Sequence, residues 1–144
     1  MKKIIKFNNI PKIININDIK RLISIFVKNE GFGIKKIEYN FVSEDRMLKL
    51  NTKYLKHKTE TDIITFDYSK SKKIQAEIYL CFSVIERNAK ENMQTAENEM
   101  VRVIIHGLLH CMGYNDKNNA DRELMRKKED SFLKMFHVKQ FNNV

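Results

Sequence analysis

Two histidines and an aspartate lie close together in the last third of the chain. His106 and His110 are four residues apart, and Asp116 follows six residues after His110. On a helix, side chains at i and i+4 share one face, so both imidazoles can reach one ion. The pair alone is a weak signal, because two helix histidines facing a polar groove would look the same. A glycine stop at Gly113 followed by an acidic residue makes a divalent-metal site the more specific interpretation.

The chemistry expected of such a site is hydrolysis. Three protein ligands leave one coordination position for water, and zinc lowers the pKa of that water to about 7. Position 107 is glycine, so the glutamate that acts as general base in His-Glu-x-x-His zinc proteases is missing. This difference argues against peptide hydrolysis by that mechanism. Cys111 points about 100° away from His110 around the helix and is expected to be a small buried residue.

Length and composition fit one globular domain over residues 1–144, with 42% hydrophobic residues. No apolar run approaches the roughly 20 residues of a membrane helix, and the N-terminus lacks the apolar segment of a signal peptide. Two cysteines make no disulfide framework, so a reduced, cytoplasmic protein is expected. The net charge of +9 fits a polyanionic partner and a lysine-rich solvated surface equally well.

Hydrophobic periodicity predicts the elements that position these residues. Their order indicates an α+β fold, in which about five helices pack on a small mixed sheet of about four strands. The metal site would lie at the end of the central helix, and the third and fourth strands would form a hairpin. Helix N-caps are predicted at Asn17, Ser43, Ser83 (a capping box) and Thr95. The predicted strands are 2–7, 37–41, 62–66 and 74–80. The predicted helices are 17–30, 83–93, 95–112 and 120–136. A further helix after Ser43 would carry Met47, Leu50 and Tyr54.

Three segments of the chain, in this order, carry a resemblance to a known family. They are Leu50-Asn51-x-x-Tyr54 followed by Thr-Asp-Ile-Ile-Thr-Phe at 61–66, Ala-Glu-Ile-Tyr-Leu at 76–80, and His-Gly-x-Leu-His-x-x-Gly-Tyr at 106–114. Together they resemble the YbeY family of bacterial rRNA-maturation endoribonucleases. The order of the predicted elements agrees as well, so the resemblance covers essentially the whole chain.

The resemblance implies a hydrolase of single-stranded RNA that processes the 3′ end of 16S rRNA and takes part in ribosome maturation and quality control. The small ribosomal subunit would be its partner, with no membrane and no nucleotide cofactor. It also implies one zinc ion held by three histidines spaced His-x3-His-x5-His. Here the first two map to His106 and His110, whereas Asp116 stands at the third position. The extra negative charge would make a bound water less acidic and could favour a different metal.

A second departure from the family concerns a cation. The family usually has an arginine after the aromatic residue of the Leu-Asn segment, and this chain has Leu55 there. Nearby cations could bind RNA phosphates instead, although each could equally be an ordinary solvated side chain: Arg46, Lys53, Lys56 and Lys58.

Two acidic residues of the matching segments, Asp62 and Glu77, are predicted to act as general base or to orient a metal ligand. A strand-end cap and a surface acid are the competing interpretations. For the protein as a whole, two alternatives to an RNA hydrolase stay open. One is a metal-dependent hydrolase of another substrate, such as a peptide or amide. The other is a non-catalytic ribosome assembly factor whose metal is structural. The sequence leaves the oligomeric state undetermined.

Overall fold

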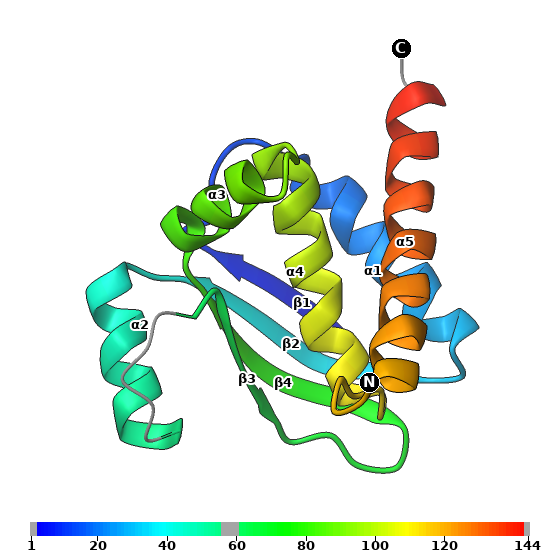
Figure 1. Cartoon of the computed structure of the whole chain (residues 1–144). Helices are drawn as coiled ribbons and strands as arrows, with labels where there is room; N and C mark the ends of the chain where they lie inside the picture. The colour runs from blue at the N-terminus through cyan, green and yellow to red at the C-terminus, as the bar shows by residue number, and fades with distance from the viewer. Residues whose placement is uncertain (1–2, 56–60, 143–144) are drawn as a thin grey trace.

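The computed structural model describes residues 3–55 and 61–142 as helices around a four-stranded sheet (Figure 1). The strands are β1 (Ile4–Asn8), β2 (Gly33–Phe41), β3 (Ile63–Asp67) and β4 (Lys73–Leu80). The helices are α1 (Ile16–Asn29), α2 (Glu44–Leu50), α3 (Phe82–Glu91), α4 (Ala96–Cys111) and α5 (Asn119–Asn142), and a π-helical turn, η1 (Asn51–Leu55), follows α2.

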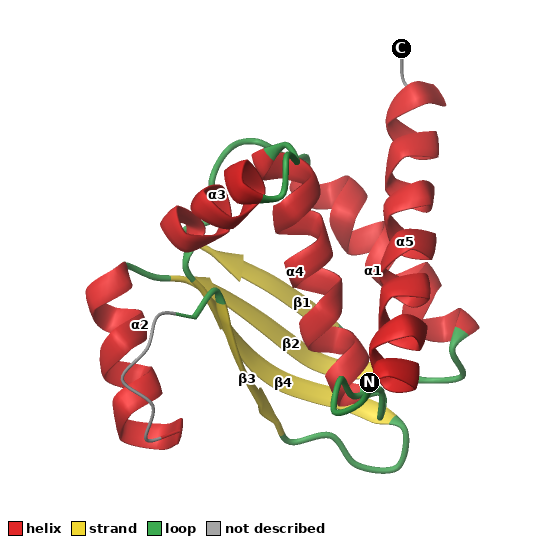
Figure 2. Cartoon of the chain, in the orientation of Figure 1, coloured by secondary structure: helices red, strands yellow, loops and turns green. Residues whose placement is uncertain are grey.

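The sheet is mixed and has the strand order β1-β2-β4-β3. β1, β2 and β4 run parallel, and β3 pairs with β4 as an antiparallel hairpin, so β3 forms one edge. Helices α1, α3, α4 and α5 gather over one face of the sheet (Figure 2). Successive strand residues face opposite sides, and Ile64 packs with Met47 and Leu50 of α2, which therefore lies against the other face. The expected α+β architecture is confirmed.

Helix α4 is the central element of the helical layer. It is apolar around most of its circumference, as expected for a helix buried on several sides, and it contacts α3, α5, β3 and β4. The helix lies close to the sheet at Gly107, where a Cβ atom would lie 3.0 Å from Ile63 Cδ1 and 3.1 Å from Thr65 Oγ1. A glycine at this position therefore lets α4 lie directly on the hairpin.

Two of the predicted helix starts are wrong, although all the predicted elements exist. Asn15, not Asn17, caps α1: its side chain accepts a hydrogen bond from the amide of Asp18. Helix α3 begins at Phe82, directly after β4, with Cys81 as an N-cap that makes no side-chain hydrogen bond. Ser83 cannot cap this helix because it already lies inside it, and its hydroxyl donates to Glu44.

Other ends also differ from the prediction: β2 begins at Gly33 rather than at 37, and α2 ends at Leu50, so that Tyr54 lies in η1 instead of α2. Ser43 and Thr95 cap α2 and α4 as predicted. Helix α5 starts one residue early, where Asn118 accepts from the amide of Asp121, and it extends to residue 142 rather than 136. Within the described residues, no helix combines the length and apolar character needed to cross a membrane.

Candidate metal centre

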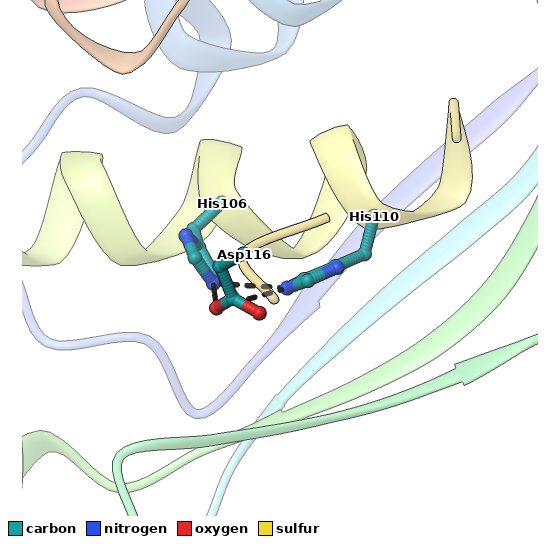
Figure 3. Close-up of side chains that lie close together, drawn as sticks. All are labelled: His106, His110 and Asp116. Carbon is teal, nitrogen blue, oxygen red and sulfur yellow. Dashed lines mark hydrogen bonds and ion pairs between the residues drawn. The ribbon is translucent and has the colours of Figure 1, made fainter. Parts of the chain in front are cut away.

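The three predicted ligands meet at the C-terminal end of α4. His106 and His110 project from the same side of the helix, and Asp116 approaches them from the following loop (Figure 3). The His106 and His110 Nε2 atoms are 3.0 Å apart. Asp116 Oδ2 lies 3.7 Å from His106 Nε2 and 3.9 Å from His110 Nε2. In the described part of the chain, this is the one group of three such residues that could hold a metal ion.

These separations suit a single ion. Zinc–ligand bonds of about 2.0–2.1 Å in a tetrahedral arrangement place neighbouring donor atoms about 3.3–3.4 Å apart. The observed distances of 3.0, 3.7 and 3.9 Å bracket that value. Two imidazoles and a carboxylate also form a donor set that zinc accepts, so the residues fit the metal that the spacing predicts.

The sharp turn after α4 brings Asp116 back to the histidines. Gly113 has φ +94°, a left-handed conformation that favours glycine, and its amide donates to the carbonyl of His110. Two side chains fix the loop that follows. Arg122 donates to the backbone carbonyl of Asp116, and the Tyr114 hydroxyl donates to Glu30 near the C-terminus of α1. The loop of the predicted third ligand is thus held by contacts from α5 and from the C-terminal end of α1.

A buried carboxylate on α5 orients the first histidine. Glu129 is only 6% exposed, and its Oε2 lies 2.6 Å from His106 Nδ1. Its other oxygen accepts from Arg102 at 2.8 Å. A proton on His106 Nδ1 satisfies Glu129 and leaves Nε2 free to bind a metal, the arrangement typical of carboxylate–histidine–metal sites. Glu129 thus selects the ring orientation and tautomer that the site needs.

Electrostatics distinguish the two histidines. Burial lowers the pKa of His106, but the hydrogen bond to Glu129 and its charge outweigh this and leave the pKa raised. Burial and the neighbouring His106 lower the pKa of His110, against a hydrogen bond to the backbone of Tyr114. Burial also raises the pKa of Glu129, but its hydrogen bonds to His106 and Arg102 leave it lowered, so this carboxylate is ionised at neutral pH.

A hollow of about 250 Å³, here called the His106 hollow, opens beside the cluster. Asp62, the residue directly before β3, lines this hollow. Burial raises the pKa of Asp62, although backbone hydrogen bonds, His106 and Asn88 act in the opposite direction. The charged residues that line the hollow are Asp62, Glu99, Arg102, His106, Arg126 and Glu129.

The structure does not bring Glu77 to the metal centre. Its neighbours on β4, Ala76 and Ile78, are buried on the face that carries α4, so Glu77 is exposed on the opposite face. There the hydroxyl of Tyr79 lies 3.5 Å from its carboxylate. The prediction that Glu77 acts in catalysis gains no support from this position.

The two predicted RNA-binding cations that the structure describes do not line the His106 hollow. Arg46 is on α2 and Lys53 on η1, both exposed, and neither lines the His106 hollow. The ammonium of Lys53 lies 5.2 Å from the ring centroid of Tyr54. Lys56 and Lys58 fall outside the described residues.

The position of Gly107 explains why no glutamate follows His106. A Cβ atom there would lie 3.0 to 3.3 Å from side-chain atoms of Ile63, Thr65 and Ile78, so any side chain at this position would be crowded against the hairpin. A glutamate at this position would require these side chains to move, which adds a packing argument against the protease motif to the one from the sequence.

Glu129 and Arg102 were not among the predicted site residues. Glu129 is 23 residues from His106, on another helix, and no local motif connects them. One signal was present: Glu129 occupies the apolar stripe of α5, between Met125 and Phe132, where a buried charge needs a partner.

Comparison with known proteins adds to this geometry. The family model described as Endoribonuclease YbeY matches residues 5–137. The Endoribonuclease YbeY of Flavobacterium johnsoniae is 46% identical over 113 residues, or 78% of each chain. Its counterpart in Flavobacterium psychrophilum is 44% identical over 125 residues, covering 87% of this chain and 86% of that one. The solution structure of a protein from Thermotoga maritima superposes with a TM-score of 0.70 at 29% identity, over 96% of this chain and 93% of the other.

Proposed function

The chain belongs to the YbeY endoribonuclease family, and we propose that it hydrolyses single-stranded RNA at a metal centre formed by His106, His110 and Asp116. The observation that carries this proposal is the convergence of two imidazole nitrogens and a carboxylate oxygen within 4.8 Å of one another. The ion would be divalent, with zinc expected from the donor set. When bound, it would supply Lewis acidity and an activated water beside an RNA phosphodiester.

The protein's own residues would orient and protonate the reacting groups. Glu129 holds His106 by its Nδ1 proton, so that Nε2 faces the centre. Asp62 lines the same hollow as His106, and its raised pKa suits a carboxyl that gains and loses a proton during hydrolysis. Asp62 is therefore our candidate for acid–base transfer, whereas Glu77 faces the other side of the sheet.

The expected substrate is rRNA in the small ribosomal subunit, with processing near the 3′ end of 16S rRNA. The net charge of +9 would attract the phosphate backbone at long range. Arg46 and Lys53 are exposed and could contribute to this attraction, away from the cleavage centre.

A purely structural metal is less well supported by the geometry. Closed structural zinc sites have four protein ligands. Only three donors converge here among the described residues, and Glu129 uses its carboxylate on His106 and Arg102 instead. The site therefore keeps a position that a water molecule or a substrate oxygen could occupy.

The test is cleavage of rRNA that carries an unprocessed 3′ end. Wild type is compared with His110→Ala and with a chelated sample to which zinc is later returned. We expect cleavage by the wild type, loss in both controls, and recovery when zinc returns only to the wild type. Equal cleavage in all samples would refute the proposal and indicate a contaminating nuclease. A wild type that binds zinc but leaves RNA intact would refute RNA hydrolysis itself.

A further inference from the structure

Two arginines line the His106 hollow, and only one of them, Arg102, is hydrogen-bonded to other side chains. Arg102 donates to Glu129 and to Asp130, each at 2.8 Å. Arg126 is exposed and forms no hydrogen bond or ion pair with any described residue, and its charge acts on Glu99 only at longer range. Of the two arginines that line the hollow, Arg126 is therefore the one whose hydrogen-bond donors are free for a ligand.

The helix geometry places Arg126 beside the proposed centre. It precedes Glu129 by three residues on α5, so both side chains lie on one face of that helix. Glu129 contacts His106, and Arg122, one turn before Arg126, donates to the carbonyl of Asp116. Along α5, Arg126 thus lies between Arg122, which contacts the loop of Asp116, and Glu129, which contacts His106.

The charge of the hollow gives this cation a specific use. Asp62, Glu99 and Glu129 contribute carboxylates that would repel a phosphate group. Arg102 offsets Glu129, with which it is paired. A phosphate that enters the hollow therefore needs a further cation, and Arg126 lines the same wall.

We propose that Arg126 binds the RNA phosphodiester that lies at the metal centre, through its guanidinium and the non-bridging phosphate oxygens. This inference rests on the proposed function and names the cation that seats its substrate. A guanidinium suits the task because its planar fork matches two phosphate oxygens and stays charged at every physiological pH.

A matched pair of variants can test the assignment. Arg126→Gln and Lys127→Gln remove one positive charge each from adjacent exposed positions of α5, and Lys127 does not line the hollow. A general loss of attraction to RNA would affect both variants equally. Arg126→Lys keeps the charge but loses the planar fork. Each protein is first checked for zinc content and thermal unfolding, which should match the wild type.

Two measurements follow: kcat and KM for a short single-stranded RNA, and Kd of the chelated protein for that RNA over a range of salt concentrations. We expect Arg126→Gln to lose about 10- to 100-fold in kcat/KM, Lys127→Gln less than about twofold, and Arg126→Lys an intermediate amount. The salt slope of log Kd should fall by about 0.7 in Arg126→Gln, the value for one lost phosphate contact on a single strand.

The outcomes separate this inference from the proposed function. If the wild type cleaves and the two Gln variants cleave equally well, Arg126 does not bind the phosphate although the enzyme is an RNase. If the wild type does not cleave, the proposed function fails, and the binding comparison still decides: equal Kd values and salt slopes for the two Gln variants overturn the assignment.

Discussion

Replacing Glu129 with glutamine tests whether the buried carboxylate prepares His106 for the metal. Glutamine keeps the shape of the side chain and removes its charge. The Glu129 side chain is 8% exposed and makes two short contacts, to His106 at 2.6 Å and to Arg102 at 2.8 Å. The amide can accept one of these hydrogen bonds but presents N–H groups to the other donor. One buried donor is therefore left unsatisfied.

The magnitude follows from those two contacts. Hydrogen bonds to charged groups contribute about 1.5–3 kcal/mol each, and neutral ones about 1. Since Arg102 keeps Asp130 as a partner, we expect Glu129→Gln to lower the free energy of unfolding of the metal-free protein by about 2–3 kcal/mol. Loss of a hydrogen-bond partner behind a metal-bound histidine weakens metal affinity by about 10- to 100-fold, which is about 1.4–2.8 kcal/mol.

The assay is competition for zinc with a chromophoric chelator, combined with urea unfolding of the metal-free proteins. Asp130→Asn is the matched control, because Asp130 contacts the same arginine but not the histidine. Its side chain is 58% exposed, so its loss should cost less than about 1 kcal/mol and leave the zinc Kd unchanged. If Glu129→Gln binds zinc as tightly as Asp130→Asn, Glu129 does not orient the ligand, whatever its effect on stability.

Three further predictions concern the ligands and their surroundings. Asp116→Ala should lower zinc content in metal analysis, whereas Asp116→His should retain it; undiminished zinc in the alanine variant would remove Asp116 from the site. Gly107→Glu should abolish cooperative thermal unfolding. The reason is that overpacking costs about 1–3 kcal/mol and burial of the carboxylate costs more. A cooperative transition near that of the wild type would contradict the close approach of α4 to the sheet. Burial raises the pKa of Glu30, but hydrogen bonds from Lys128 and Tyr114 outweigh it and leave the pKa lowered. The stabilisation from Glu30 is therefore present at neutral pH and lost as the pH falls through its lowered pKa. Glu30→Gln should reduce the urea midpoint most at pH 7 and progressively less as the pH is lowered; a reduction that does not change with pH would disprove this.

The sequence was sufficient for those features that depend on near neighbours. The i, i+4 spacing places His106 and His110 on one face of α4, and the glycine after the helix allows the turn to Asp116. The alternation in β4 and the apolar stripes of α1 and α4 predict elements that the structure contains. These features follow from backbone geometry within one or two turns of chain, which a single sequence encodes directly.

Features that depend on tertiary contact could not be predicted in the same way. Glu129 reaches His106 because α5 packs antiparallel beside α4, a relation that no local pattern specifies. Glu77 looked equivalent to Asp62 as an acid in a strand segment. The pleat of the sheet places it on the opposite face, since its neighbours Ala76 and Ile78 face α4. Ser83 satisfied a capping pattern, but α3 begins directly from β4 and leaves it inside the helix.

The closeness of the three proposed ligands along the chain has a consequence for how a metal ion would exchange. All of them lie between residues 106 and 116, so an ion there closes only a short loop and removes little entropy from the unfolded chain. Its stabilising effect should be concentrated in the turn after α4 and, through Glu129, in α5. Adding zinc should then slow amide hydrogen exchange in these segments while β1, β2 and β4 keep the protection they already have. The centre could thus lose and regain its metal when the turn after α4 opens locally. The sheet would stay folded throughout and keep α4 in place for the ion to bind again.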